Sequence, residues 1–380
     1  MRKMKLAPCI VLISILFWTF VQTANAQIKL DVGGYMQNWY IANQSVERLE
    51  SSLDGGVPTT SIYSSDVNGF RIRRARMTAR GQINERFSST IWIEFAGNTP
   101  SLLDFHVDAR FRPWFNLRVG QFIMSGQSHD TARLASSRLV FYERSPITTR
   151  LASVMGYTAF RDIGIMAYGQ HGRLWYGIHA GNGGGQFVHA GSNITERKAG
   201  GGLYGARFDY TLTDGLTFGG HASTNQQRDV VRSGSAPYDV DRSSWSLRLA
   251  SNDFGINGLF TQFEYMSLKA DDGNIGFPGI NDGEYLLHGF YGEIGYKLTR
   301  EWHILARYDE MIEKPRQMAQ HVIAPRAQIN NYTVGFSRFI YNDGGSEIAR
   351  LHLNYSFGET GPVDLNNSIL VAVLQVRFIP

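Results

Sequence analysis

The sequence predicts an all-β fold, a sixteen-stranded antiparallel transmembrane β-barrel with a polar interior. The segment from Leu102 to Phe111 shows the pattern most clearly, because apolar side chains alternate there with charged or titratable ones. Successive side chains of a strand point to opposite faces, so this segment has one apolar face and one charged face. Similar segments recur along the chain between clusters of Gly, Asn, Asp and Pro. Together with an N-terminal export signal, this recurrence is typical of an outer-membrane barrel.

The predicted export signal covers residues 1–26. It has a basic start, an apolar run from Ile10 to Val21 and a small-residue cleavage site at Ala24 to Ala26. The run is too short to span a bilayer comfortably, which argues against an uncleaved anchor. We therefore expect cleavage before Gln27 and a single barrel domain over residues 27–380.

The composition fits a barrel and excludes several other classes. The one cysteine, Cys9, lies inside the signal, and no later stretch approaches 18 consecutive apolar residues, so no transmembrane helix is expected. Three of the 37 Lys and Arg residues also lie in the signal, so the rest nearly balance the 33 Asp and Glu residues. This balance gives no reason to expect a nucleic-acid partner. The chain has only seven lysines, so its basic side chains are overwhelmingly arginine.

The alternating segments divide the barrel into sixteen predicted strands. They are Ile28–Ala42, Asn68–Gly81, Phe87–Gly97, Leu102–Phe111, Asn116–Ile123, Phe160–Gly169, Arg173–Ala180, Gly200–Tyr210, Leu216–Gln226, Arg242–Ser251, Gly258–Leu268, Tyr285–Lys297, Trp302–Met311, Gln328–Ile340, Ile348–Phe357 and Ser368–Ile379.

The connections between these strands alternate in length. Those after even-numbered strands are short, as at His171–Gly172, whereas most of those after odd-numbered strands are long, as at Asn43–Val67. A bacterial barrel has short periplasmic turns and longer extracellular loops, so both termini are expected in the periplasm. The brief link near Asn98 to Ser101 is an exception on the outer side.

Strand parity assigns the arginines to the barrel interior. In the second strand, Ala75 and Met77 share the face expected to contact lipid, whereas Arg74 and Arg76 share the other. A charge facing lipid at mid-membrane costs about 2–4 kcal/mol, so these arginines should point inward. The predicted pore-lining arginines are Arg74, Arg76, Arg80, Arg110, Arg118, Arg207, Arg248, Arg307 and Arg350. The acids expected on the same face are Glu94, Asp104, Asp108, Asp209, Glu264, Glu293 and Asp309.

Two arginines of the second strand break this parity. Arg71 and Arg73 fall on the lipid side, so they either lie at the extracellular rim or the strand is bulged there. We also expect a double charge reversal at Arg74 and Arg76 to shift ion preference toward cations. It should leave the barrel's stability nearly unchanged, because both positions are predicted to face water.

The interior charges permit two functional interpretations. An arginine-lined path favours small anions, because guanidinium stays charged and its donor fork suits phosphate and carboxylate. Alternatively, acids and arginines neutralise each other and only solvate the wall. The longest loop, Met124 to Ala159, is predicted to fold inward and narrow the pore, or else to form an outer contact. Its basic candidates are Arg133, Arg138, Arg144 and Arg150.

Four motifs give a specific resemblance. Gly69–Arg76, Arg118–Phe122, Phe141–Ser145 and Arg161–Ile165 resemble segments of the phosphate-selective porin O and P family. The resemblance implies a sixteen-stranded barrel, usually trimeric, which passes phosphate or other anions by diffusion past an inward-folded third loop. Family members that take up phosphate use lysines, whereas this chain has few, which leaves a general or differently selective porin open.

An enzyme or an adhesin is the alternative class. Hydrolysis needs a nucleophile, a base and an orienting group together, and no G-x-S-x-G or H-E-x-x-H motif is present. The interior histidines predicted by parity, among them His221 beside Ser223, leave a barrel phospholipase as the enzyme hypothesis. We expect no cofactor, no metal and no catalytic residue. The expected partners are outer-membrane lipid, small anions or other small solutes, and two further copies of the chain.

Overall fold

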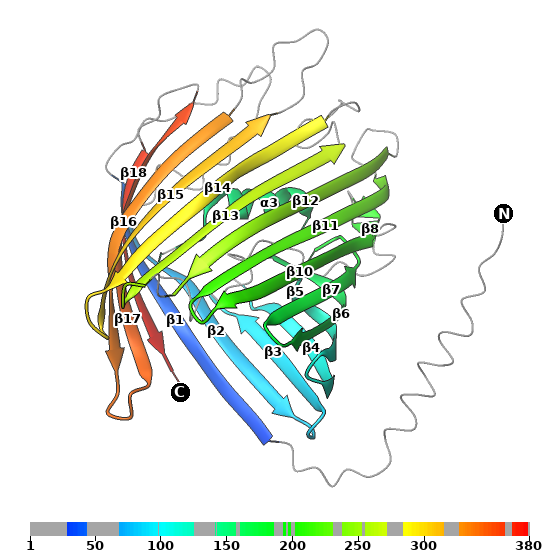
Figure 1. Cartoon of the computed structure of the whole chain (residues 1–380), viewed down its shortest axis with the longest axis horizontal. Helices are drawn as coiled ribbons and strands as arrows, with labels where there is room; N and C mark the ends of the chain where they lie inside the picture. The colour runs from blue at the N-terminus through cyan, green and yellow to red at the C-terminus, as the bar shows by residue number, and fades with distance from the viewer. Residues whose placement is uncertain are drawn as a thin grey trace, which may run out of the picture.

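The computed structural model describes sixteen long strands that close into one barrel. The described residues are 29–43, 68–97, 99–124, 141, 143–156, 160–185, 193–194, 197–198, 202–230, 238–252, 255–271, 284–314, 327–361 and 367–378. The predicted signal, Arg133 and Arg138 lie outside these residues. Every barrel strand pairs antiparallel with its neighbour, and β1 pairs with β18 to close the sheet (Figure 1).

The sixteen barrel strands correspond one to one with the predicted ones. They are β1 (Lys29–Asn43), β2 (Gly69–Gln82), β3 (Phe87–Glu94), β4 (Ser101–Arg112), β5 (Phe115–Ile123), β6 (Arg161–His171), β7 (Leu174–Gly181), β10 (Gly202–Thr213), β11 (Leu216–Val230), β12 (Tyr238–Ser251), β13 (Leu259–Asp271), β14 (Glu284–Lys297), β15 (Trp302–Lys314), β16 (Ala327–Tyr341), β17 (Glu347–Gly361) and β18 (Asn367–Arg377). Two-residue strands β8 (Asn193–Ile194) and β9 (Arg197–Lys198) form a separate small ladder.

Several strands extend beyond their predicted ends on the long-loop side. β11 continues to Val230, β13 to Asp271, β15 to Lys314 and β17 to Gly361. Apolar alternation is required only where one face contacts hydrocarbon, whereas backbone pairing continues past that depth. Periodicity therefore located the membrane-crossing part of each strand and missed the polar extension.

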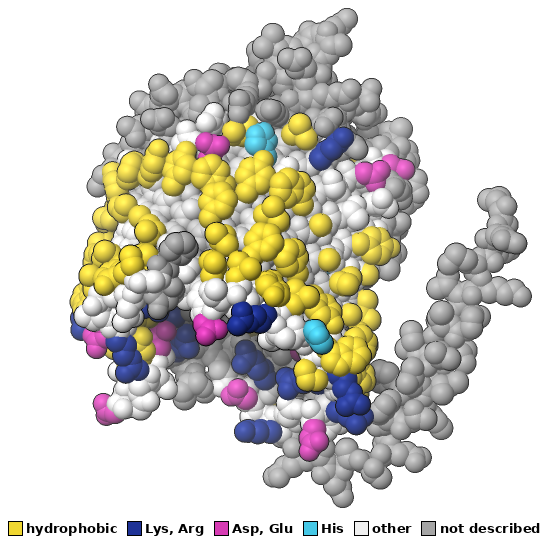
Figure 2. All heavy atoms as spheres, in the orientation of Figure 1, with side chains coloured by type: hydrophobic (Ala, Val, Ile, Leu, Met, Phe, Trp, Pro, Cys, Tyr) yellow, Lys and Arg dark blue, Asp and Glu magenta, His cyan; other side chains and the backbone are white. Residues whose placement is uncertain are grey.

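Side chains alternate between an apolar outer face and a polar inner face. In β12, Trp245 and Leu247 are exposed, whereas Ser244 and Ser246, which alternate with them, are buried. Figure 2 shows hydrophobic side chains gathered in a band on the outer wall, with basic and acidic side chains below that band. The polarity pattern is that of a barrel in a membrane.

One residue of the best-patterned segment faces the other way. Phe105 and Val107 are exposed on the outer face as predicted, but Leu103 is buried against Tyr35 and Trp92. The β3–β4 register shifts at this point, where Trp92 pairs with Asp104 and the next residue with Leu102. The bulge makes Leu103 an extra residue and turns its side chain to the inside.

The described residues contain one helix, α3 (Pro146–Met155), within the predicted constriction loop. Pro occupies the first turn, and Gly156 ends the helix in the left-handed region with φ of 88°. Its contacts are with β12, β13, β14 and β15. Among the residues described, no helix is long and apolar enough to cross a bilayer.

Candidate functional site

A bulge in β2 brings four arginines to the barrel interior. Gln37 of β1 pairs with Arg74, but the next β1 residue pairs with Ile72, so Arg73 is the inserted residue. The shift returns Arg71 to the inner face, where its guanidinium lies 4.7 Å from the ring centre of Trp39. Arg73 lies 5.5 Å from the same ring. The bulge alternative for the two parity-breaking arginines is therefore confirmed.

Glu143 of the long loop contacts this arginine group from inside the barrel. Its carboxylate accepts hydrogen bonds from Arg73 Nε at 3.0 Å and from Arg74 Nη2 at 3.0 Å. Its carbonyl accepts one from Arg307 Nη1 of β15 at 2.9 Å. Burial alone would raise the pKa of the Glu143 carboxyl, but Arg74 and Arg73 hold that pKa well below its usual range. The chain at Glu143 thus links β2 to β15.

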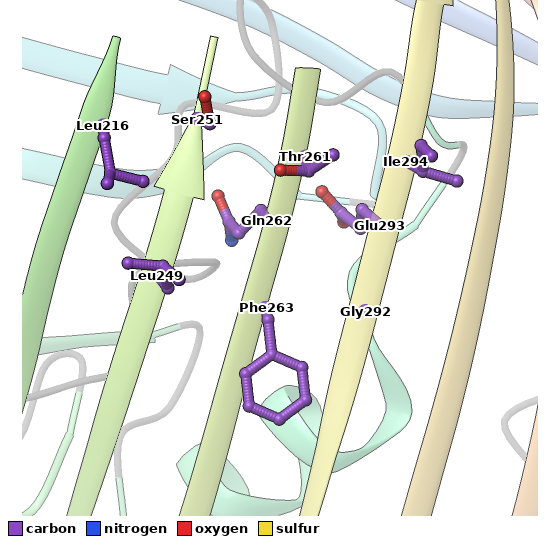
Figure 3. Close-up of a pocket in the computed structure, with 9 residues that line it drawn as sticks. All are labelled: Leu216, Leu249, Ser251, Thr261, Gln262, Phe263, Gly292, Glu293 and Ile294. Atoms are coloured by element: carbon purple, nitrogen blue, oxygen red, sulfur yellow. The ribbon is translucent and has the colours of Figure 1, made fainter. Parts of the chain in front are cut away.

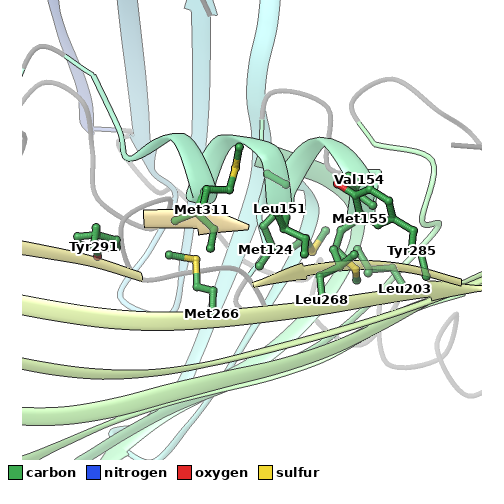
Figure 4. Close-up of a cluster of buried hydrophobic side chains, with 14 of the residues drawn as sticks. Met124, Leu151, Val154, Met155, Leu203, Met266, Leu268, Tyr285, Tyr291 and Met311 are labelled. Atoms are coloured by element: carbon green, nitrogen blue, oxygen red, sulfur yellow. The ribbon is translucent and has the colours of Figure 1, made fainter. Parts of the chain in front are cut away.

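The helix that follows Glu143 packs on the inner wall through apolar side chains. Figure 4 shows Leu151, Val154 and Met155 of α3 directed at side chains of the neighbouring strands. The cluster residues outside the helix are Met124, which directly follows β5, and the strand residues Phe122, Met166, Leu203, Met266, Leu268, Ala270, Tyr285, Leu287, Tyr291 and Met311. These apolar residues occupy interior positions of the barrel, so a polar lumen face is not continuous around the wall. The helix α3 covers these apolar side chains and takes the place of water on that part of the inner wall.

Polar contacts hold the middle and the C-terminal end of this helix. Arg150 Nε donates to Glu313 of β15 at 3.0 Å, and the Tyr285 hydroxyl donates to the same carboxylate. At the C-terminal end, Asn225 Nδ2 of β11 donates to the carbonyls of Met155 and Gly183. The helix is thereby fixed to β11, β14 and β15.

Most predicted interior arginines are paired with the acids predicted on the same face. The shortest distances are Arg76–Glu94 2.6 Å, Arg118–Asp108 2.8 Å, Arg207–Asp209 3.0 Å, Arg248–Asp209 3.3 Å and Arg307–Asp309 2.8 Å. Arg350 instead pairs with Glu347, at 2.6 Å. The acids therefore meet their arginines across neighbouring strands or along one strand, as in a neutralising network.

In three of the ion pairs the arginine is more exposed to water than its acid, whereas in the pairs of Asp209 the two members are almost equally exposed. The Arg118 side chain is 27% exposed and its partner Asp108 only 8%. The Arg73 side chain is 37% exposed and Glu143 17%. Arg150 is likewise more exposed than Glu313. At these three places the cation is the group that water or a solute meets first.

Three predicted pore-lining arginines do not face open water. The side chains of Arg74, Arg307 and Arg350 are only 2–3% exposed. The premise that Arg74 faces water is therefore wrong. A glutamate there would be buried beside Glu143, so the expectation of unchanged stability no longer follows. Arg80 and Arg110 lie near strand ends and are exposed, with no ion pair among the described residues.

Parity did not identify Arg161 as an interior residue. Its guanidinium donates to both carboxylate oxygens of Asp104, at 2.8 and 3.0 Å, and is buried. The preceding Phe160 has a left-handed backbone with φ of 66°, and both Arg161 and Asp162 are buried. Neighbours in a regular strand face opposite sides, so alternation cannot place both inside. Arg144, another loop candidate, lies 4.5 Å from the ring centre of Phe160.

A hollow of about 250 Å³ lies in the wall formed by β12–β14 (Figure 3). Its lining residues are Leu216, Leu249, Ser251, Thr261, Gln262, Phe263, Gly292, Glu293 and Ile294. Leu249, Phe263 and Ile294 belong to the exposed outer face, and Gly292 adds no side chain between them. The hollow contains none of the predicted arginines and is a feature of the lipid-facing surface.

A buried serine, histidine and glutamate also lie together in β11–β13. Ser246 Oγ is 2.6 Å from His221 Nδ1 and donates to Glu264 at 2.7 Å. Hydrolysis by such a set requires the histidine to lie between the serine and the acid, whereas here the serine is in the middle. Ser223, the other predicted partner, contacts Ser244 instead. Among the described residues, no three His, Cys, Asp or Glu side chains are grouped to hold a metal.

Solved structures with a similar fold are porins and other outer-membrane proteins. An anion-selective porin from Comamonas acidovorans is 12% identical, with a TM-score of 0.62, over 93% of this chain and 100% of that one. OmpT of Vibrio cholerae in its trimer form is 10% identical, with a TM-score of 0.62, over 92% and 99%. OmpF of Salmonella typhi, solved with daunomycin, is 10% identical, with a TM-score of 0.62, over 94% of this chain and 99% of that one. At these identities the likeness shows the barrel fold.

The family assignment rests on the sequence. No curated protein matches the chain. The family described as phosphate-selective porin O and P matches residues 57–320, which is more than half of the chain and includes the β2 arginines, α3 and the strands that α3 contacts. The chain therefore belongs to the phosphate-selective porin O and P family and is an outer-membrane porin.

Proposed function

We propose that the barrel is a passive diffusion channel that prefers small anions. The observation that supports this preference most directly is the unequal exposure within ion pairs. At Arg73, Arg118 and Arg150 the guanidinium is more exposed than the carboxylate it neutralises. At these three places a solute in the lumen meets a cationic donor before it meets the carboxylate that neutralises it. Acids nearly as numerous as arginines are compatible with anion preference under this arrangement.

The helix α3 and the contacts of Glu143 support a constriction inside the barrel. The chain from Glu143 to Met155 is held to β2, β11 and β15 by the hydrogen bonds given above. We infer that this segment narrows the path and that Arg150, on its exposed side, contributes to selection there. Arg133 and Arg138 remain candidates of the same loop.

The anion class follows the family. Phosphate is the first anion to test, and the scarcity of lysine favours a channel that accepts other small anions as well. We further propose a homotrimer, in line with the trimeric form of the Vibrio cholerae OmpT neighbour, removal of residues 1–26 on export, and no enzymatic activity.

The test is reversal potential in a planar bilayer under a potassium chloride gradient. We expect chloride to be preferred over potassium in the unaltered porin. Arg118→Gln and Arg150→Gln should each reduce that preference, whereas Arg338→Gln, at an exposed pair with Glu301 near the strand ends, should not. Added phosphate should reduce chloride current if the two anions share the path. Cation preference in the unaltered protein would refute the proposal, and lipid hydrolysis without conductance would favour a phospholipase.

A further inference from the structure

The turn between β4 and β5 is folded over the outer wall of the barrel. Gln170 N donates to the carbonyl of Pro113 at 2.9 Å, and the Tyr176 hydroxyl donates to the carbonyl of Trp114. A Cβ atom at Gly169 would overlap the backbone of Trp114, so only glycine allows this approach. Tyr176 lies on the outer face of β7, because its sequence neighbours Trp175 and Gly177 face the interior. The turn therefore rests on the lipid side of β6 and β7.

A bulge places a cation on this outer surface. Arg110 pairs with Asn116, but the next pair is Arg112 with Phe115, so Phe111 is inserted. Arg112 consequently shares the outer face with Phe115, whose ring stacks on Phe111 at 5.8 Å. Trp114 is 52% exposed beside them. One exposed cation and three exposed aromatic rings are thus brought together at the short-turn end of the barrel.

The neighbouring turn supplies a second cation next to an open hollow. Arg173 Nη1 donates to the carbonyl of Leu212 at 2.8 Å, which fixes the side chain across β7 and β10. Arg173 lines a hollow of about 500 Å³ with Thr213, Asp214 and Gly215. The hollow is polar and lies between the β6–β7 and β10–β11 turns, at the same end of the barrel as Arg112.

The charge around this patch is positive. The ends of β2 to β7 carry the exposed residues Arg86, Arg110, Arg112 and Arg173, and Arg86 lies beside Arg110 through a backbone hydrogen bond of 2.8 Å. Glu85 and Asp214 are the acids of the adjoining turns. At the ends of β14 to β18 two arginines are paired with acids instead, Arg338 with Glu301 and Arg377 with Glu347, whereas Arg300 donates to the carbonyl of Gly345.

We propose that Arg112, Trp114 and Arg173 form a binding site for an anionic phospholipid of the periplasmic leaflet. The aromatic rings and the two arginines all lie at the short-turn end of the barrel, where acyl chains meet the headgroup region. A phospholipid bound there would place its phosphate at the arginines and its acyl chains along the apolar wall. Figure 2 shows basic, histidine and hydrophobic side chains side by side at this edge. The inference rests on the proposed membrane orientation and not on anion transport.

Lipid binding is measured by native mass spectrometry of the purified porin titrated with phosphatidylglycerol or phosphatidylethanolamine. The porin should bind phosphatidylglycerol more tightly. Each arginine near an anionic lipid contributes a factor of about five, so Arg112→Gln/Arg173→Gln should weaken phosphatidylglycerol binding about 25-fold. Arg338→Gln, which removes a neutralised charge at the same end, should leave it unchanged.

Three results would overturn the site. They are equal affinity of the porin for the two lipids, unchanged phosphatidylglycerol binding in the double variant, and a loss of phosphatidylglycerol binding in Arg338→Gln as large as that in the double variant. A changed number of subunits in the double variant would assign the patch to contact between copies of the chain. Conductance recorded on the same preparations distinguishes failure of the lipid site from failure of the proposed anion channel. The outer patch should not alter ion selectivity, so the double variant should keep the selectivity of the unaltered porin.

Discussion

The contact of Glu143 with β2 gives a quantitative prediction about the lumen segment. Glu143→Gln keeps the size of the side chain but removes the charge that Arg73 and Arg74 share. Arg74 is only 2% exposed, so it cannot exchange the lost carboxylate for water. Removing one partner of a buried pair costs about 3–5 kcal/mol, and the lower figure applies because Arg73 is partly solvated.

The assay is hydrogen exchange of the α3 backbone amides. A loss of about 3 kcal/mol in docking free energy raises their exchange roughly a hundredfold if α3 opens as a local unit. The matched control is Glu301→Gln, which breaks an exposed pair with Arg338 at 4.0 Å and should cost less than about 1 kcal/mol. Reversal potential should also move toward anions, because one lumen carboxylate is lost. Unchanged α3 exchange together with unchanged selectivity would refute the docking role of Glu143.

Further predictions concern packing, pH and the folded-over turn. Leu151→Ala removes a fully buried side chain and should weaken α3 docking by about 2–3 kcal/mol, seen as faster amide exchange. The pKa of Glu143 is held below its usual range in the folded protein. Its contribution to the free energy of α3 docking is therefore fully present above the pKa of the unfolded state, and it is lost only as pH falls through the lower pKa of the folded state. Docking should therefore persist from pH 7 to pH 5 once exchange is corrected for intrinsic rates, and opening at pH 5 would contradict this. Gly169→Ala should lower stability in denaturant by about 1–3 kcal/mol through overlap with Trp114, whereas Gly97→Ala, with room for a methyl group, should not.

Strand number, order and polarity were predictable because the hydrocarbon imposes period-two alternation on every crossing. The exceptions are local backbone irregularities. Arg73 and Leu103 sit at bulges, and the left-handed Phe160 precedes Arg161. A single inserted residue reverses the face of its neighbours. The charges of Arg71 and Arg73 on the lipid parity signalled such an insertion, whereas the apolar Leu103 gave no such signal.

The helix α3 was not predicted, because its stability comes from tertiary contact. Its sequence, PITTRLASVM, contains two adjacent β-branched threonines and only ten residues, which is too short to hold a helix in water. The signal that could have found it lies elsewhere, at Met266, Leu268 and Leu287. These apolar side chains occupy interior positions of β13 and β14, where a water-filled lumen would require polar ones. Such residues indicate that something covers the wall.

The balance of charges in the sequence is a poor guide to what a solute meets. An aspartate carries its carboxylate on one methylene group, so Asp108 stays against the wall, whereas the three methylenes of Arg118 carry the guanidinium into the lumen. At this pair the charge nearer the lumen is therefore the basic one, although the pair as a whole is neutral. At other pairs the order differs: Arg207 and Asp209 are almost equally exposed, and at Glu347 and Arg350, where the guanidinium lies near the Phe339 ring, the glutamate is the more exposed member. Side-chain length and packing, and not net charge, decide which sign faces the path.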